Sequence, residues 1–403
     1  MTSTGLWTRM VHAGEGRQAP LGRPVATPIY ATAAFTYDSM EDVDKVFSGQ
    51  GGDYVYTRHG NPTVAAFEEA MSILEDGEGA CAYASGMAAM HAALFACDLT
   101  PGSTVLASQD LYGATLGLLD HVFAAAGVQT VTADFCDLDD VREKTLGAKP
   151  KALIAETLSN PLLKVCDLHG CALIAKEAGA RLVVDNTFAS PFLCQPLTLG
   201  ADFVVHSATK YLSGHGDSMG GVVVARRAQD LKALAKVMKL VGGVLSVWEA
   251  HHLLRGIKTL GLRLERQCDN ARQLAGLLRE DARLARVHYP ARSEAAASGL
   301  LDRVLRQPHA GALVSIELKD NTRAAAFRFM NALKLCVRLT SLGDVATGVS
   351  HSASSSHREV PPETRARLGI TEGLVRISVG IEDVADLHAD ISQALAASVG
   401  LVK

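Results

Sequence analysis

The amino-acid sequence predicts an α/β protein with a large, mostly parallel sheet covered by helices and a smaller C-terminal α+β domain. Nearly continuous apolar strands alternate with helical stretches through the middle of the chain, which is typical of a parallel sheet buried on both faces. A length of 403 residues favours two or more domains over one ordinary core. Polar and ionisable side chains directly follow several strands, where parallel sheets bind ligands.

The first part of the chain is irregular, with prolines at positions 20, 24 and 28 and a glycine-rich run at 49–52. A long irregular segment in a compact enzyme is usually functional or wraps a neighbour. The sequence therefore predicts an N-terminal arm over 1–60, a large domain over 61–255 and a C-terminal domain over 256–403.

A helix is expected after the arm. One apolar face at helical spacing is formed by Val64, Phe67, Met71 and Leu74. Gly77 ends this pattern, and a strand is expected over 80–84.

Ser85-Gly86-Met87 opens an alanine-rich helix directly after that strand. The N-terminus of a helix offers free N–H groups and the positive end of the helix dipole to a phosphate. Plain capping by Ser85 is the alternative interpretation.

The strands expected next are short and apolar. They cover 104–107, 129–133, 152–156, 182–185, 203–206 and 221–225. Their carboxyl ends should meet at one edge of the sheet, and Asp185, Ser207 and Lys210 lie at such ends. The glycine fingerprints of dinucleotide and P-loop sites are missing from the sequence.

Lys210 lies just past an apolar strand, between small hydroxylated residues and a glycine-rich turn. A lysine in such a place is poorly solvated, so its amine loses proton affinity and can attack an aldehyde. Asp185 ends an earlier strand, and an acid there can pair with a protonated pyridine nitrogen. The two strand ends together suggest a pyridoxal 5'-phosphate (PLP) site with Lys210 as its Schiff-base lysine. A strand-end lysine that reaches solvent is the alternative.

A long helical region is expected after the sheet ends near residue 227; it includes the segment from residue 248, runs to about residue 280 and is followed by the smaller domain. The strands of that domain are expected over 312–318 and 374–379, and its helices over about 322–333 and 383–397. Arg376 lies inside the last apolar strand. A buried arginine must find an anion, so Arg376 is a candidate ligand for a carboxylate.

Two motifs, Ser207-Ala208-Thr209-Lys210-Tyr211 and Asp185-Asn186-Thr187, resemble those of a known family. The family is the Cys/Met-metabolism group of fold type I PLP-dependent enzymes, which contains methionine gamma-lyase, cystathionine gamma-lyase and O-acylhomoserine sulfhydrylase. The resemblance runs from about residue 28 to about residue 383. It implies the fold type I PLP-dependent transferase fold and an amino-acid substrate.

The resemblance also implies roles for particular side chains. The residues that would bind PLP are Tyr56, Arg58, Ser85, Gly86, Met87, Tyr112, Asn160, Asp185, Ser207, Thr209 and Lys210. Tyr56 and Arg58 would come from the arm of a neighbouring subunit, which implies a homodimer at least, or a homotetramer. Arg376 and Ser341 would hold the substrate carboxylate, and Asn160 would lie near both substrate and cofactor.

Three of these residues also have plainer interpretations. Arg58 could be a solvated loop charge and Tyr112 a core tyrosine. Asn160 precedes a proline, and Asn-Pro is otherwise an ordinary turn.

The implied activity is γ-elimination on a sulfur-containing or homoserine-derived L-amino acid, as in methionine and cystathionine gamma-lyases. Lys210 would act as the base at the α-carbon, and Tyr112 would protonate the leaving sulfur or oxygen. γ-Replacement, as in O-acyl-L-homoserine sulfhydrylase or cystathionine gamma-synthase, is the alternative. Ala114 stands where methionine gamma-lyases carry a cysteine, and Thr340 stands where cystathionine lyases carry a glutamate. A non-catalytic PLP-binding protein is disfavoured because the lysine, the acid and the arginine are all present.

Composition narrows the partners and the compartment. The formal net charge of −4 gives no electrostatic reason to expect nucleic acid or an anionic membrane. No apolar run reaches membrane-spanning length, and the N-terminal sequence lacks signal-peptide features, so a cytoplasmic protein is predicted. The eight cysteines, without metal-site spacing, are interpreted as reduced structural thiols. His351 and His357 are interpreted as solvated loop histidines.

Overall fold

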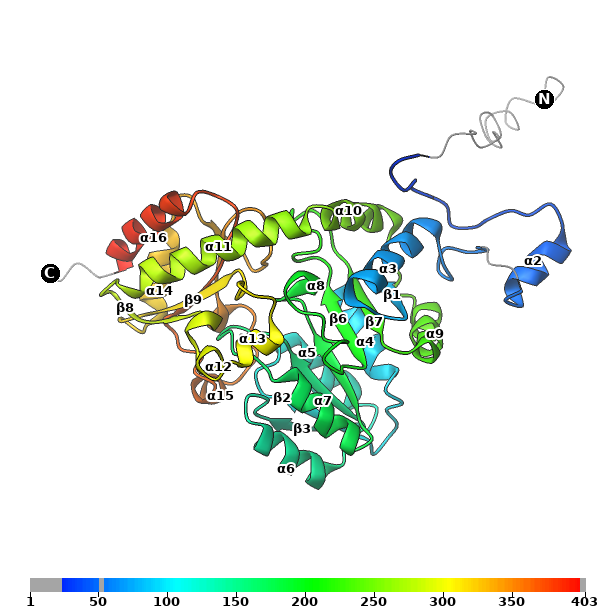
Figure 1. Ribbon diagram of the computed structural model, residues 1–403, viewed down its shortest axis with the longest axis horizontal. Helices are drawn as coiled ribbons and strands as arrows, with labels where there is room; N and C mark the ends of the chain where they lie inside the picture. The colour runs from blue at the N-terminus through cyan, green and yellow to red at the C-terminus, as the bar shows by residue number, and fades with distance from the viewer. Residues whose placement is uncertain (1–23, 51–53, 399–403) are drawn as a thin grey trace, which may run out of the picture.

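The computed structural model describes residues 24–50 and 54–398. Residues 1–23 and 51–53, which belong to the predicted arm, and residues 399–403 lie outside the described residues. Figure 1 shows two packed parts, each built on a sheet, and a segment with helix α2 (Met40–Phe47) that extends away from both.

The larger sheet contains seven strands in the order β1-β7-β6-β5-β4-β2-β3. The strands β2 to β6 run parallel, whereas β7 pairs antiparallel with both β1 and β6. The strands are β1 (Gly79–Tyr83), β2 (Thr104–Ser108), β3 (Gln129–Ala133), β4 (Ala152–Glu156), β5 (Arg181–Asp185), β6 (Phe203–Ser207) and β7 (Gly221–Ala225). Each strand expected between residues 80 and 225 is confirmed to within one residue at either end.

Both faces of this sheet are buried, which explains its nearly continuous apolar strands. In β5, Leu182 and Val184 face one hydrophobic core, and Val183 faces the other. The first core is covered by α3 (Pro62–Glu75), α6 (Leu138–Ala148) and α7 (Leu168–Glu177). The second core is covered by α4 (Gly86–Phe95), the π-helix η1 (Leu118–Phe123) and α9 (Leu231–Val241).

The smaller sheet has five strands in the order β10-β11-β12-β9-β8. Its strands are β8 (Leu284–His288), β9 (Leu313–Leu318), β10 (Val337–Arg338), β11 (Gly348–His351) and β12 (Leu374–Ser378). The strands expected near 312 and 374 are confirmed, as are the helices α14 (Arg323–Ala332) and α16 (Val384–Ser398). The other three strands were not predicted, because β10 and β11 are very short and β8 contains a register irregularity.

The expected long helical region consists of three helices: α9, α10 (Val247–Ile257) and α11 (Leu260–Arg279), with a break between α10 and α11 at Lys258 and Thr259. The remaining helices are short: α5 (Gly113–Gly117), α8 (Ser190–Leu193), η2 (Ala228–Asp230), η3 (Pro290–Arg292), α12 (Glu294–Ala297), α13 (Leu300–Val304), η4 (Ser352–Ser354) and α15 (Pro362–Arg367).

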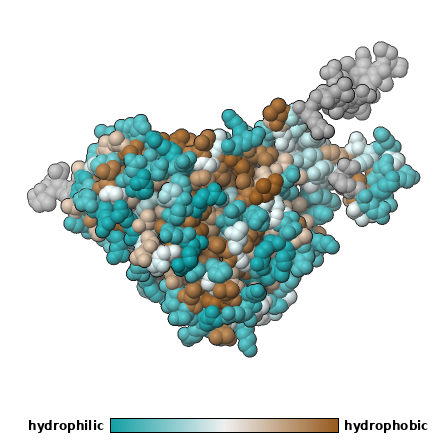
Figure 2. Space-filling model, viewed as in Figure 1, coloured by the Kyte–Doolittle hydropathy of each residue, from teal (hydrophilic) through white to brown (hydrophobic). Residues whose placement is uncertain are grey.

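The surface view shows a mostly hydrophilic face with hydrophobic residues gathered from its upper edge through its middle (Figure 2). Exposed apolar side chains of the protein include Ile73 on α3, Trp248 on α10 and Leu262 on α11. Within residues 24–50 and 54–398, no helix combines the length and apolarity needed to span a membrane.

Candidate active site

A cavity of about 260 Å³ lies at the carboxyl ends of β4, β5 and β6, against loops of the smaller sheet. Ten of the predicted site residues line it: Ser85, Gly86, Met87, Tyr112, Asn160, Asp185, Ser207, Thr209, Lys210 and Arg376. Residues far apart in the sequence therefore meet where a parallel sheet is expected to bind its ligand.

Lys210 lies in the turn that follows β6 and projects toward the smaller domain. Its Nζ atom donates a hydrogen bond to Ser341 Oγ at 2.8 Å. Burial, with a smaller contribution from the Arg376 guanidinium, lowers the pKa of the Lys210 amine. The poor solvation expected from the sequence is confirmed, and the alternative of a lysine reaching solvent is wrong.

Asp185 and Glu156 end the neighbouring strands β5 and β4 and pair in register, so both carboxyl groups face the cavity. Asp185 Oδ1 accepts a hydrogen bond from the Thr187 N–H at 3.0 Å. Burial raises the pKa of Asp185, and burial together with the Asp185 charge raises the pKa of Glu156 well above its usual range. Two adjacent, poorly solvated carboxyl groups resist being ionised together.

The N-terminus of α4 faces the same cavity. Ser85 is the N-cap, and its Oγ accepts the Ala88 N–H at 3.2 Å. By helix geometry, the N–H groups of Gly86 and Met87 have no intrahelical acceptor, so they are available to an anion. A Cβ atom on Gly86 would lie 2.8 Å from Ser207 Cβ, so only glycine lets helix and strand end approach this closely.

Tyr112 is 39% exposed and lines the cavity, so its interpretation as a core tyrosine is wrong. It precedes α5, and its N–H donates to Glu156 Oε1 at 2.6 Å. This hydrogen bond holds the backbone of Tyr112 against the Glu156 carboxyl group, which also lines the cavity.

Arg376 is 4% exposed in the middle of β12. Its Nη1 donates to Asn160 Oδ1 at 2.7 Å and its Nη2 to the Ser341 carbonyl at 3.3 Å. The buried Nε has no hydrogen-bond partner among the residues that the structure describes. Burial lowers the pKa of the guanidinium to about 10, so it remains cationic at neutral pH. An unpartnered buried N–H on a cation is what an incoming carboxylate would satisfy.

These features fit PLP. The Lys210 amine matches the aldehyde, the Asp185 carboxyl matches the pyridine nitrogen, and the α4 N-terminus matches the phosphate. Thr209 lies beside Ser207, and its Oγ1 is fixed by the Gly220 N–H at 3.1 Å.

Tyr56 and Arg58 do not line this cavity. Arg58 Nη1 donates to the Lys239 carbonyl, and the guanidinium lies 5.4 Å from the centre of the Tyr56 ring. Their assignment to the active site of a neighbouring subunit remains a prediction.

The interpretation of His351 and His357 as solvated loop histidines is wrong. Their exposed fractions are 3% and 2%. His351 is the last residue of β11 and pairs with Val375 of β12, whereas His357 lies in the loop after η4. His351 Nε2 bonds to the Glu372 carbonyl at 2.9 Å, and His357 Nδ1 bonds to Ser356 Oγ at 3.0 Å. Burial lowers the pKa of His357 to about 4, so it is neutral at pH 7.

Sequence reasoning missed several residues of the cavity wall: Met90, Thr115, Glu156, Leu158, Thr187, Phe188, Met219, Leu342 and Ser356. Glu156 had a usable signal, since it ends a predicted strand as Asp185 does. Loop residues such as Met219 and Leu342 carry no such signal, because only the tertiary fold brings them to the cavity.

Residues 7–396 match the family model described as Cys/Met metabolism PLP-dependent enzyme. The chain belongs to this family. It is 42% identical over 395 residues to an L-methionine gamma-lyase of Pseudomonas putida, covering 98% of both chains. It is 40% identical over 388 residues to a cystathionine gamma-lyase of Bacillus subtilis, covering 96% of this chain and 98% of the relative.

A solved structure of cystathionine gamma synthase from Xanthomonas oryzae pv. oryzae, in complex with aminoacrylate and cysteine, is also similar. It superimposes with a TM-score of 0.86 at 36% identity, covering 93% of each chain. The fold type I architecture, the dependence on PLP and the membership of an enzyme family are thereby confirmed.

Proposed function

We propose that this protein catalyses PLP-dependent γ-elimination on a sulfur-containing or homoserine-derived L-amino acid, as methionine and cystathionine gamma-lyases do. One observation carries the proposal: Arg376 and Lys210 line the same small cavity, and the buried Nε of Arg376 has no hydrogen-bond partner among the described residues. Ser341 contacts both, since its Oγ accepts from Lys210 and its carbonyl from Arg376. An amino acid held by its carboxylate at Arg376 would present its α-carbon near the lysine amine.

The chain's own residues then have distinct tasks. Arg376 binds and orients the carboxylate through a planar fork of donors. PLP, when bound, supplies an electron sink for negative charge that develops at the α-carbon. Asp185 provides the carboxylate that pairs with the pyridine nitrogen. Lys210, with its lowered pKa, takes the α-proton as general base. Tyr112 lies in the cavity wall, where its hydroxyl can protonate the departing sulfur or oxygen.

The rest of the wall supports an uncharged leaving group. Phe188, Met219 and Leu342 line the cavity beside the catalytic groups, and Thr340 adds a neutral hydroxyl. The ionisable lining residues described by the structure are Tyr112, Glu156, Asp185, Lys210 and Arg376. Each of these residues already has a task or a partner. An uncharged leaving group, such as the thioether sulfur group of methionine, is therefore favoured over one that carries a second charged amino-acid moiety.

γ-Replacement is the second candidate, of the O-acyl-L-homoserine sulfhydrylase or cystathionine gamma-synthase type. It is supported by the similarity to a cystathionine gamma synthase over 93% of the chain. The departure at Ala114 from the methionine gamma-lyase pattern also supports it.

A homodimer at least, and a homotetramer built from such dimers, is the proposed assembly. Ile73, Trp248 and Leu262 are exposed apolar side chains on the neighbouring helices α3, α10 and α11, and side chains of this kind are often buried between subunits. The arm over 1–60 would carry Tyr56 and Arg58 to the phosphate site of the partner subunit. The proposed division of the rest of the chain is a large domain over 61–255 and a C-terminal domain over 256–403.

The free cysteines support a reducing compartment, the cytoplasm.

A product assay tests the proposed function. Purified protein with PLP receives L-methionine, L-cystathionine or O-acetyl-L-homoserine, each with and without sulfide. The proposal expects 2-oxobutyrate without sulfide, most rapidly from the substrate with the smallest uncharged leaving group. Homocysteine formed only from O-acetyl-L-homoserine and sulfide would replace elimination by the second candidate.

A further inference from the structure

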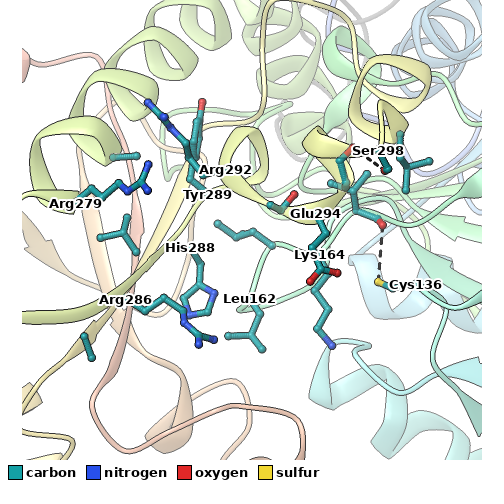
Figure 3. Close-up of a pocket in the computed structure, with 18 of the residues that line it drawn as sticks. Cys136, Leu162, Lys164, Arg279, Arg286, His288, Tyr289, Arg292, Glu294 and Ser298 are labelled. Atoms are coloured by element: carbon teal, nitrogen blue, oxygen red, sulfur yellow. Dashed lines mark hydrogen bonds between the residues drawn. The ribbon is translucent and has the colours of Figure 1, made fainter.

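A second cavity of about 1020 Å³ lies between the two parts of the protein and shares no lining residue with the active-site cavity. One wall is the segment 162–165, which follows β4. The other wall comes from the end of α11, from β8 and from the helices η3 and α12. Figure 3 shows Arg279, Arg286 and His288 on one side of this cavity and Lys164 and Glu294 on the other.

Basic side chains dominate the charged lining. Four lysines or arginines line the cavity, against two acidic residues, Asp134 and Glu294. In the part of the chain that the structure describes, Arg279, Arg286 and Arg292 form no ion pair with a carboxylate. Arg286 lies close enough to the Glu317 carboxylate to help lower its pKa, which leaves Arg279 and Arg292 without an acidic partner among the described residues. Guanidinium groups gathered around one cavity favour a ligand with phosphate or carboxylate groups.

The lining also has apolar parts. Leu162, Leu284, Val287 and the buried ring residue Tyr289 contribute to the walls. The volume matches the upper end of ordinary small-molecule sites, well above what an amino acid fills. We propose that this cavity binds an organic anion of nucleotide size, with its anionic groups on the arginines and a flat aromatic ring against the walls.

Lys164 connects this cavity to the active site by two routes. Its Nζ forms a salt bridge to Asp110 at 2.9 Å, and Asp110 lies two residues before Tyr112. Its backbone closes the turn that carries Asn160: Lys164 O accepts the Ser159 N–H at 2.9 Å, and the Lys164 N–H donates to Ser159 Oγ at 3.0 Å. One residue of the second cavity therefore holds the segments that position Tyr112 and Asn160.

An anion in the cavity competes with Asp110 for the Lys164 ammonium group. Asp110 is 9% exposed, so weakening its salt bridge to Lys164 leaves a poorly solvated carboxylate. The segment that connects Asp110 to Tyr112 should then shift. The bound anion should therefore lower kcat/KM for the amino-acid substrate. This kinetic consequence rests on the proposed function, whereas binding itself does not.

Isothermal titration calorimetry of the holoenzyme with ATP tests the site, with pyrophosphate as the anion that lacks an aromatic ring. ATP should bind with one site per chain and more tightly than pyrophosphate. Removing two arginines in the variant Arg279→Ala/Arg292→Ala should weaken ATP binding by about tenfold or more. Arg303→Ala is the matched control, because Arg303 is an exposed arginine outside this lining, and it should bind ATP as the unmodified protein does.

The absence of ATP binding at millimolar concentration, or equal affinity in the double variant, overturns the site. The link to the active site is tested by kinetics: ATP should lower kcat/KM at least about twofold, and less in Lys164→Met. An unchanged kcat/KM at saturating ATP refutes the link. If the chosen amino acids are not turned over at all, the proposed function fails while calorimetry still decides the site.

Discussion

Replacing Arg376 by alanine should remove most of the binding energy for the substrate carboxylate. In the structure, Nε is buried without a partner and Nη2 makes only a 3.3 Å bond, so these two donors form the fork that a carboxylate would occupy. Two charge-assisted hydrogen bonds of about 1.5–3 kcal/mol each give a loss of about 3–6 kcal/mol. That corresponds to a decrease in kcat/KM of about 10²-fold to 10⁴-fold.

The assay compares steady-state kinetics of the unmodified protein, Arg376→Ala and Arg376→Lys. Lysine keeps the charge but not the planar fork, so its loss should be intermediate. A substrate analogue without the carboxylate, such as 3-methylthiopropylamine, controls for indirect damage, because its slower turnover should not depend on residue 376. Retention of PLP absorbance shows that the variants are folded. Unchanged kcat/KM in Arg376→Ala, or an equal loss with the analogue, would refute the carboxylate role.

Three further substitutions test other parts of the account. Glu156→Gln keeps an acceptor for the Tyr112 N–H and should lower kcat/KM by less than about tenfold. Glu156→Ala leaves that donor unpaired and should lower kcat/KM by about 10-fold to 100-fold. Equal losses in the two variants would mean that the hydrogen bond does not position Tyr112. Arg58→Ala should raise the dissociation constant for PLP, measured by equilibrium dialysis, by about tenfold or more if Arg58 reaches the partner's phosphate site; an unchanged constant removes it from that site. The third is a pH experiment on His357, whose pKa is about 4 when folded and near 6.5 when unfolded. The unfolded chain binds the extra proton between these values, so stability falls as pH decreases from about 6.5 to 4, by up to about 3 kcal/mol. Urea unfolding of His357→Gln should show a flatter pH dependence in that window, and a curve parallel to that of the unmodified protein contradicts the assignment.

The large sheet could be predicted from the sequence because its strands are buried on both faces. Continuous apolar runs such as β4 and β5 have one interpretation once helices alternate with them. The same logic placed Asp185 and Lys210 at one edge, since the carboxyl ends of parallel strands coincide. These arguments need only local pattern and sheet geometry.

The parts that could not be predicted depend on tertiary packing. His357 is a loop residue, as expected, but tertiary packing buries it almost completely. The strands β10 and β11 are too short to leave a periodic signal. Glu156 became meaningful only when the register placed it beside Asp185 and the Tyr112 backbone.

The central claim is that Lys210 holds the cofactor at the junction of the two parts. Reducing the holoenzyme with borohydride fixes PLP covalently to the amine that carries it, and mass spectrometry of the digest identifies the modified peptide. The account predicts the pyridoxyl phosphate group on the peptide that contains Lys210, in near-stoichiometric yield. The group on another lysine, or on none while the protein is fully active, would contradict it.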